Sequence, residues 1–323
     1  MTPRAIRGLL FAILSLLPAW AAAQSGDFPK TQVRVVVPYP AGGSLDAIAR
    51  PMGPPFEQLT GQGLLIENVP GAGGLIAASR VVQSKADGYT LLLASNAQVS
   101  TALVQYPSMN YDPQTDLVPI IHLVDQVAVL YTSAKSPYRS AADVVAAAKR
   151  DPGGVNVAST GGISHFAIEL LGQTAGVRFN HVPYKGAAAA LQDLAGGQVP
   201  LLFTYVGSAK ALTAAGMVRP IAVASDKRMA SLPDVPTFAE AGLPAMVASV
   251  WVGLMGPKDL PAATIQRIAE VSNAILKQPE YRQKMEGLSM IIQGGSPADL
   301  RAVIQADTRK WSQLAKTVNL KIE

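Results

Sequence analysis

The sequence has 323 residues, with 27 lysines and arginines against 22 aspartates and glutamates, and it has no cysteine. The missing cysteine excludes disulfides, thiol nucleophiles and zinc–thiolate sites. The formal net charge is +5, and it falls to +3 without the two arginines of residues 1–23, which contain no acidic residue. No basic block is interleaved with aromatic residues, so we expect no nucleic-acid partner.

Residues 1–23 are typical of a secretory signal peptide. Arg4 and Arg7 precede an apolar run at 9–17, and three alanines at 21–23 offer a cleavage site before Gln24. The apolar run is too short to span a bilayer as a mature anchor. The alternative, an uncleaved N-terminal anchor, is disfavoured by the Ala-x-Ala sequence. We therefore expect an exported protein.

The segment 33–46 has the features of an anion-binding βα turn. The β-branched run 33–37 predicts a buried parallel strand. Glycines at 42 and 43 allow close backbone approach, and Ser44 or Asp46 can cap a helix over 45–50. The N–H groups and dipole of a helix N-terminus suit a carboxylate or phosphate, although many such turns bind nothing.

Strands and helices alternate after this first unit. The pattern predicts strands at 63–68 and 89–94, with a helix between them that ends at Gln83. Ser95 and Asn96 follow the second of these strands. They either line a ligand site at the carboxyl edge of the sheet or cap the next segment.

A second anion-binding turn is predicted at 155–166. Its strand is followed by Gly161 and Gly162, by Ser164 at an N-cap position, and by a helix over 166–173. The two turns lie about 120 residues apart. If they face each other across a cleft, each can donate N–H groups to one end of a dianion.

The other predicted elements continue the α/β alternation. Roughly 300 mature residues exceed one ordinary core, so two domains are expected. Trp251 and Trp311 are predicted as core or rim residues. The further strands are expected at 126–131, 199–203 and 221–224, and the further helices at 141–150, up to Leu194, at 262–276 and at 297–315.

The chain resembles the periplasmic receptors of tripartite tricarboxylate transporters, often called Bug solute-binding proteins. The resemblance covers essentially the whole mature chain in the family's order. The motifs that carry it lie at 36–43 with Asp46 and 48–50, at 67–68, 70–74, 87–92, 111–113, 182–186, 191–199, 232–237 and 240–244.

This resemblance implies a two-domain α/β periplasmic-binding-protein (Venus flytrap) fold with two crossovers, no catalytic activity and no cofactor. The domains would be 24–126 with 226–323, and 127–225. A monomeric receptor would capture a small carboxylate in the periplasm and pass it to permease subunits. Hinge closure is expected near 124–127 and 224–227.

The ligand site implied by the resemblance lies between the two glycine-rich loops that the residue pattern had already indicated. Asn96 comes from the polar strand end, and Thr204 ends the strand 199–203. Together with the two loops, the predicted ligand-binding residues are Tyr39, Ala41, Gly42, Gly43, Ser44, Asp46, Asn96, Ser159, Thr160, Gly161, Ser164, His165 and Thr204.

The sequence departs from the family pattern at Thr204, where members that bind amino acids commonly carry an aspartate. Threonine cannot pair with an ammonium group at full charge, so we expect an amine-free dicarboxylate or an aromatic, phthalate-type acid. Tyr39 and Tyr205 can flank a ring or simply pack. A second departure is proline at 51, 54 and 55, which predicts that the helix is kinked or restarts near Gln58.

The roles of His165 and of Lys185 are each open to a binding and a structural interpretation. His165 either donates to a carboxylate or holds its loop. His122 and His181 are read as strand-end residues without ligand-spaced partners, which predicts no metal site. Lys185 either adds charge to the cleft or ties its turn to a neighbouring loop, with the second reading slightly favoured.

Two other functions are compatible with the α/β pattern. A ligand-loaded receptor can signal to a membrane sensor, and the sequence does not separate this from transport. An exported hydrolase needs a nucleophile, a base and an acid within reach of one another. Neither Ser44 nor Ser164 lies in a Gly-x-Ser-x-Gly turn, and the adjacent residues Ser164 and His165 do not make a triad.

Overall fold

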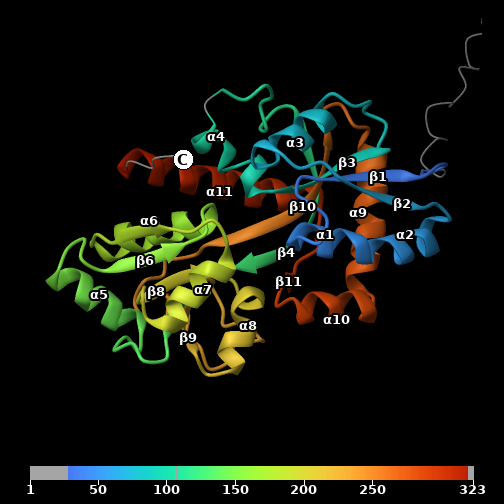
Figure 1. Ribbon diagram of the computed structural model, residues 1–323. Coiled ribbons are helices and arrows are strands. Elements are labelled where there is room, and N and C mark those ends of the chain that lie inside the picture. Colours follow the sequence, from blue (N-terminus) through green and yellow to red (C-terminus); the bar gives the residue numbers. More distant parts are fainter. Residues whose placement is uncertain (1–27, 107, 319–323) are drawn as a thin grey trace, which may run out of the picture.

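The computed structural model describes residues 28–106 and 108–318, whose strands form two sheets (Figure 1). The predicted signal peptide at 1–23 lies outside the described residues. Helices cover both faces of each sheet, as in other α/β folds. We call the six-stranded sheet with its helices the first lobe, on the right in Figure 1, and the five-stranded sheet with its helices the second lobe.

The sheet of the first lobe has the strand order β11-β4-β10-β3-β1-β2. Strand β1 runs parallel to β2 and β3, whereas β10 runs antiparallel to β3 and β4. The strands are β1 (Val33–Val37), β2 (Leu64–Asn68), β3 (Thr90–Ser95), β4 (Leu117–Val127), β10 (Ser249–Pro257) and β11 (Ile291–Ile292).

Strand β1 is buried on both faces, as its continuous β-branched run predicted. Val33, Val35 and Val37 pack into one core, whereas Val36 packs into the core of the opposite face. The first core is covered by α1 (Ser44–Ala49), α2 (Gly53–Thr60), α9 (Ala262–Lys277) and α10 (Pro279–Gly287), and the second by α3 (Leu75–Val82) and the start of α11 (Pro297–Thr317).

The sheet of the second lobe has the order β7-β6-β8-β5-β9. Leu201 and Phe203 enter one core and Leu202 the other, so alternate residues of β8 face opposite helix layers. The strands are β5 (Val129–Ser133), β6 (Asn156–Ser159), β7 (Asn180–Pro183), β8 (Leu201–Thr204) and β9 (Val218–Val223). Helices α5 (Ala141–Arg150) and α6 (Ile163–Ala175) cover one face, and α7 (Ala187–Gly196) and α8 (Val206–Ala214) the other.

The chain passes between the two sheets at β4–β5 and again between β9 and β10. The passages are tied together, because Ala128 N–H donates to Ala248 O, Ala248 N–H to Ala224 O, and Ala224 N–H to Ala128 O, each at 2.9–3.0 Å. Residues 225–248 pack on the second lobe through Phe238 and Met246. The domain division stays a prediction, and we propose moving the boundary predicted at 225/226 to 248.

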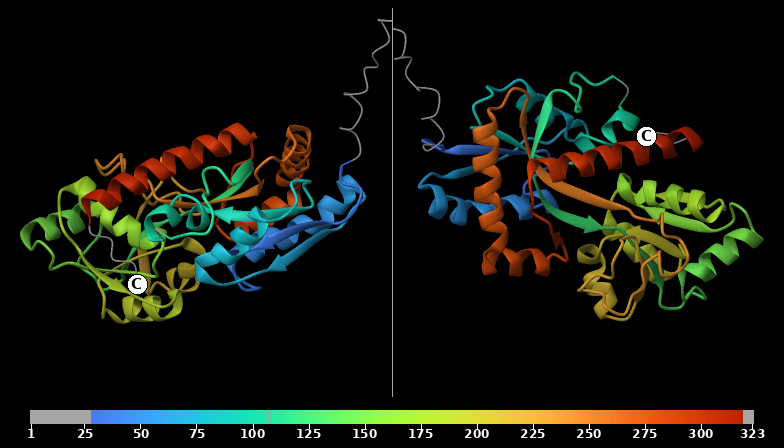
Figure 2. Two further views of the ribbon diagram at one scale, coloured as in Figure 1. Left: turned by 90° about the horizontal axis from the view of Figure 1, so that it is seen from above. Right: turned by 180° about the vertical axis from the view of Figure 1, so that it is seen from behind.

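Helix α11 packs on both lobes. Leu300 and Ile304 belong to a core of the first lobe, whereas Trp311 and Leu314 belong to a core of the second. Figures 1 and 2 show this long helix running from one lobe to the other. Of the core and rim alternatives for Trp251 and Trp311, the core is confirmed, since their exposed fractions are 2% and 0%.

The proline-rich segment after α1 interrupts the α-helix without ending the helical run, so the predicted kink is confirmed and a restart near Gln58 is not. Helix α1 ends at Ala49, a 3-10 turn η1 (Arg50–Met52) follows, and α2 begins at Gly53 rather than near Gln58. Pro54 fits the first turn of α2, where a missing N–H breaks no helical hydrogen bond. The remaining short elements are η2 (Ala72–Gly74), η3 (Asn96–Gln98) and α4 (Ala102–Gln105).

No helix in the described part of the chain is both long and apolar enough to cross a membrane.

Candidate functional site

Six loops follow parallel strands at the carboxyl edges of the two sheets. Strands β1, β2 and β3 are parallel in the first lobe, as are β6, β7 and β8 in the second. Parallel strands end at one edge of a sheet, which is where open α/β sheets bind ligands. Every residue of the predicted site lies at one of these edges, in the segments that end or follow β1, β3, β6 and β8.

Asp46 organises the loop after β1. Its carboxylate is 3% exposed, and Oδ2 accepts hydrogen bonds from Gly42 N–H at 2.9 Å and from Arg50 Nε at 2.7 Å. Oδ1 accepts from Asn68 Nδ2 at 3.0 Å. The hydrogen bond from Arg50, followed by that from Gly42, lowers the pKa of Asp46. Both oxygens therefore hold the loop in place.

The capping of α1 differs from the prediction. Gly43 is the N-cap and no side chain caps the helix, because Ser44 is already its first residue and Asp46 reaches back to the loop. Ala41, Gly42 and Ser44 are exposed. Because Gly42 N–H already donates to Asp46, the groups open to a small anion at the N-terminal end of α1 are the exposed backbone of Ala41 and Ser44 and the Ser44 hydroxyl.

Tyr39 is held by a residue that the sequence reading missed, Gln98. The amide Nε2 of buried Gln98 donates to Tyr39 Oη at 3.1 Å and to Gly73 O at 2.9 Å. Tyr39 Oη also lies 3.4 Å from Gly73 O. The network fixes the phenol among the loops after β1, β2 and β3. A Ser-x-x-Gln pattern, which marks a capping box, was the available signal for Gln98.

The two polar residues after β3 have structural contacts. Ser95 is the N-cap of η3 in a capping box with Gln98, so the capping alternative is confirmed for Ser95. Asn96 is 1% exposed, and its Nδ2 donates to Ser249 O at 2.9 Å. Asn96 thereby ties the end of β3 to the start of β10.

The loop after β6 repeats the design of the first loop. Ser164 is buried, and its Oγ accepts from Thr160 N–H at 3.1 Å and donates to Gly161 O at 2.8 Å. Gly161 and Gly162 have φ values of +83° and +55°, which favour glycine. The N-cap of α6 is Gly162, so the predicted N-cap role of Ser164 was wrong.

Two histidines stack beside this loop, a feature absent from the sequence reading. The rings of His165 and His181 lie 3.9 Å apart with 14° between their planes. His181 lies within β7, and its Nε2 is 2.8 Å from Ser159 Oγ, which accepts from Gly161 N–H at 3.3 Å. Burial, and then the charge of His165, lower the pKa of His181 to about 4.

The contacts of His165 support its loop-holding alternative, since its Nε2 lies 3.7 Å from Glu169 Oε1 and its ring packs on His181. Ser159 is fully buried, so its hydroxyl is not open to a substrate. Ser164 is bonded to its own loop rather than to a histidine. None of these residues forms a nucleophile–base–acid triad.

Thr204 ends β8 next to the first crossover. It pairs with Val129, the first residue of β5, and it is 1% exposed. Its Oγ1 is one of the few buried polar side-chain atoms of the described residues without a hydrogen-bond partner. An unpaired buried hydroxyl is costly and suits a ligand that supplies the missing partner.

Two tyrosines, Tyr39 and Tyr205, lie at the carboxyl edges of the two sheets. Tyr205 follows Thr204 in the second lobe, and burial together with the nearby phenol of Tyr39 raises its pKa. Burial also raises the pKa of Tyr39, while the hydrogen bond from Gln98 opposes that rise. The two phenols thus follow β1 in the first lobe and β8 in the second.

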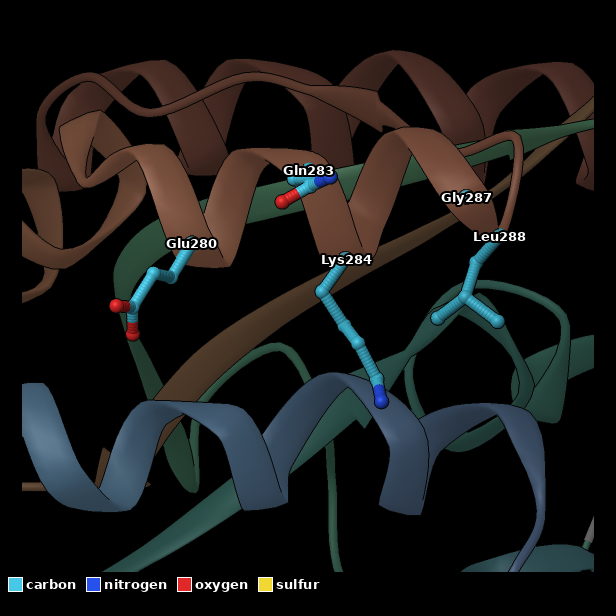
Figure 3. Close-up of a pocket in the computed structure, with 5 residues that line it drawn as sticks. All are labelled: Glu280, Gln283, Lys284, Gly287 and Leu288. Carbon is cyan, nitrogen blue, oxygen red and sulfur yellow. The ribbon is translucent and has the colours of Figure 1, made fainter.

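The hollow drawn in Figure 3 is formed by residues outside the predicted site. It has a volume of about 330 Å³ and is lined by one side of α10 with Leu288. Glu280 and Lys284 extend from this side of α10 toward the blue helical segment of the first lobe (Figure 3). None of its residues belongs to the predicted site.

No three histidine, aspartate or glutamate side chains of the described chain are grouped to hold a metal ion. His122 lies inside β4 rather than at a strand end, with Nε2 2.9 Å from Asp125 Oδ1.

Comparison with known proteins identifies the family. Residues 48–320 match the model of the tripartite tricarboxylate transporter family receptor. The chain is 32% identical over 323 residues to protein BugT of Bordetella pertussis, covering 97% of this chain and 98% of BugT. It is 33% identical over 305 residues to a protein encoded between tcbD and tcbE in Pseudomonas sp. strain P51, covering 93% and 90% of the two chains.

Solved structures agree with this assignment. Rpa4515 of R. palustris, described with adipate, has a TM-score of 0.76 at 33% identity, covering 90% of this chain and 98% of that one. MatC from Rhodopseudomonas palustris, with bound malate, has a TM-score of 0.73 at 29% identity, covering 89% and 99%. The two-lobed α/β fold is that of periplasmic solute-binding proteins, and the chain belongs to the receptor family of tripartite tricarboxylate transporters.

Proposed function

We propose that this receptor captures a small carboxylate without an amino group between its two lobes and delivers it to the membrane permease of a tripartite transporter. An aliphatic or aromatic dicarboxylate fits best. The observation that carries the proposal is the pair of similarly built loops after β1 and β6, each with glycines, exposed backbone and an organising side chain four residues on.

The hydrogen-bond donors and the charges at the two edges suit an anionic ligand. Charge-assisted hydrogen bonds from backbone N–H groups contribute about 1.5–3 kcal/mol each, so a few at each end suffice for micromolar affinity after ligand immobilisation. Asp46, the one acidic residue of the predicted site, is 3% exposed and accepts hydrogen bonds from Gly42, Arg50 and Asn68. Its carboxylate is therefore buried and engaged in the loop rather than presented to a ligand ammonium.

The residue at the end of β8 favours a ligand without an amino group. Thr204 provides an unpaired hydroxyl there, not a carboxylate. Adipate and malate, which accompany the two related structures, are dicarboxylates without an amine. Tyr39 and Tyr205 supply two aromatic rings near each other, which an aliphatic chain or an aromatic ring can contact.

A thermal-shift screen of the mature protein tests this proposal. The panel contains adipate, malate, tricarboxylates, phthalate isomers, nicotinate, aspartate and glutamate. A ligand at 100 times its Kd stabilises the native state by about 2.7 kcal/mol and raises the melting temperature. We expect a shift with an amine-free dicarboxylate and none with aspartate or glutamate. A shift with aspartate alone contradicts the role given to Thr204, and a flat response contradicts the ligand class.

A further inference from the structure

Lys185 is the only charged residue in the loops at the two carboxyl edges. The loops after β1, β2, β3, β6, β7 and β8 span 38–43, 69–74, 96–101, 160–162, 184–186 and 205, and apart from Lys185 they contain no lysine, arginine, aspartate or glutamate. The nearest charged groups on the first lobe, Asp46 and Arg50, neutralise each other. A small anion between the edges therefore meets one full positive charge.

The Lys185 side chain makes no contact that stabilises the described fold. It is exposed, and no hydrogen bond or ion pair joins it to any residue that the structure describes. Its turn is fixed by its neighbour, since Tyr184 Oη donates to Asp193 Oδ2 at 2.6 Å and Tyr184 N–H to Ser159 O at 2.9 Å. The prediction that Lys185 connects this turn to a neighbouring segment was therefore wrong, because Tyr184 makes those contacts.

The helix that follows Lys185 offers further donors. Helix α7 begins at Ala187 after Gly186, and no side chain caps it. The N–H groups of its first turn lack partners within the helix, and Ala188 and Ala189 of this turn are exposed. The positive end of the helix dipole adds to the charge of Lys185.

The unpaired hydroxyl of Thr204 lies on the same side of the sheet. Leu202 packs into the core that α7 and α8 cover, and alternation along β8 puts Thr204 on that face too. Oγ1 is buried without a partner at the carboxyl end of this strand. Lysine, backbone N–H groups and a hydroxyl can all donate hydrogen bonds, and none of them brings a negative charge.

We propose that Lys185, the first turn of α7 and Thr204 form a subsite for one carboxylate of the ligand, and that Lys185 makes the receptor prefer dianions to monoanions. The proposal rests on the proposed function. The backbone donors at α1 and α6 are neutral and hold an anion of either kind. The ammonium group of Lys185 acts fully only on a ligand whose second carboxylate reaches this subsite while the first is held by the other donors.

Matched ligands and variants test the proposal by isothermal titration calorimetry. Adipate is paired with hexanoate, and malate with 3-hydroxybutyrate, so that each pair differs by one carboxylate at equal chain length. Lys185→Met removes the charge and Lys185→Arg restores it. Lys210→Met, which removes an exposed lysine of α8 in the same lobe, is the control. Thr204→Val removes the unpaired hydroxyl at nearly constant shape.

We expect Lys185→Met to weaken binding of the diacid about tenfold and to leave binding of its monoacid within about twofold. Lys185→Arg should retain most of the affinity, Lys210→Met should change neither ligand, and Thr204→Val should weaken the diacid. Because Lys185 is exposed, its variants should keep the melting temperature of the ligand-free protein.

Three results overturn the proposal. Equal effects of Lys185→Met on diacid and monoacid, or no effect on either, overturn the Lys185 subsite and leave the carboxylate receptor intact. Failure of the native protein to bind any diacid of the screen overturns the proposed ligand class and the subsite together.

Discussion

Asp46 and Ser164 both hold a glycine-rich loop in place, one with a carboxylate and the other with a hydroxyl. Each lies in the first turn of a helix and accepts a hydrogen bond from the backbone N–H four residues earlier, in its glycine-rich loop. Asp46 carries a charge and needs Arg50 and Asn68 as further partners, whereas neutral Ser164 needs only its own loop. Both side chains shape backbone that a ligand can contact, which makes them positioning residues in the proposed site.

His181 makes stability depend on pH near the loop after β6. Its pKa is about 4 in the folded protein against 6.5 ordinarily, so the unfolded chain binds more protons between these values. Stability therefore falls as the pH drops from about 6.5 to 4 and levels off below. With a discount for solvent screening, His181 accounts for a loss of roughly 2 kcal/mol.

Unfolding in urea at several pH values checks this prediction. His181→Gln keeps a side chain that can hydrogen bond to Ser159 Oγ but removes the titration, so its stability should change less between pH 7 and 4. His122→Gln is the matched control, because His122 lies in β4, far from this loop in sequence. An unchanged pH profile for His181→Gln would contradict the role given to His181.

At the scale of elements, the strands of the first parallel units were predictable, whereas β7, β10, β11 and most of β4 were not predicted. The run 33–37 became β1 without change because β-branched residues between prolines leave few other choices. Helix starts were less predictable. Ser44 and Ser164 are good N-cap residues, yet the N-cap is Gly43 in the first loop and Gly162 in the second. The side chains of Asp46 and Ser164 instead accept hydrogen bonds from the backbone of their loops.

The contacts of the site that the sequence reading missed depend on tertiary structure. His165 and His181 stack because β6 and β7 pair in register and α6 lies over that face, which local spacing does not reveal. Gln98 reaches Tyr39 across 59 positions in the sequence. The glycine loops themselves were visible because their residue types are constrained locally.

Helix α11 is joined to the first lobe by a buried polar cluster. Asp307 is 6% exposed, and its Oδ2 accepts from Ser100 Oγ at 2.8 Å and from Trp251 Nε1 at 3.0 Å. Lys310 Nζ lies 3.3 Å from Asp307 Oδ1 and donates to Val247 O at 3.2 Å, beside the second crossover. The cluster therefore links the helix, the sheet of the first lobe and a passage between the lobes.

Asp307→Ala should lower the free energy of unfolding by about 3 kcal/mol, because it leaves buried donors unpaired. Asp299→Ala, in the exposed capping box of the same helix, should lower it by about 1 kcal/mol. Urea unfolding followed by circular dichroism measures both. Equal losses would show that the buried cluster contributes no more than a helix cap.

On the scale of the whole molecule, three segments connect the lobes. Two are the passages at β4–β5 and β9–β10, which are held side by side by the bonds among Ala128, Ala224 and Ala248. The third is α11, which is anchored to the first lobe by Asp307 and to the second by Trp311, one turn later. A closing motion must bend all three together, which favours rotation about one axis through the connections.

We expect the ligand to shift the molecule toward a form in which the carboxyl edges are closer together, because only then do both lobes contact it. The chain has no cysteine, so two spin labels can be introduced without background. Glu57→Cys on α2 and Lys149→Cys on α5 put exposed labels on opposite lobes. Double electron–electron resonance should give a shorter distance at saturating ligand.

The control pair, Lys149→Cys with Lys210→Cys, has both labels in the second lobe and should keep its distance. If the first pair also keeps its distance while calorimetry reports full binding, the lobes do not close, and the ligand is held within one lobe or in an already closed cleft. If Asp307→Ala widens the distance distribution without ligand, α11 limits the opening of the cleft in addition to stabilising the fold.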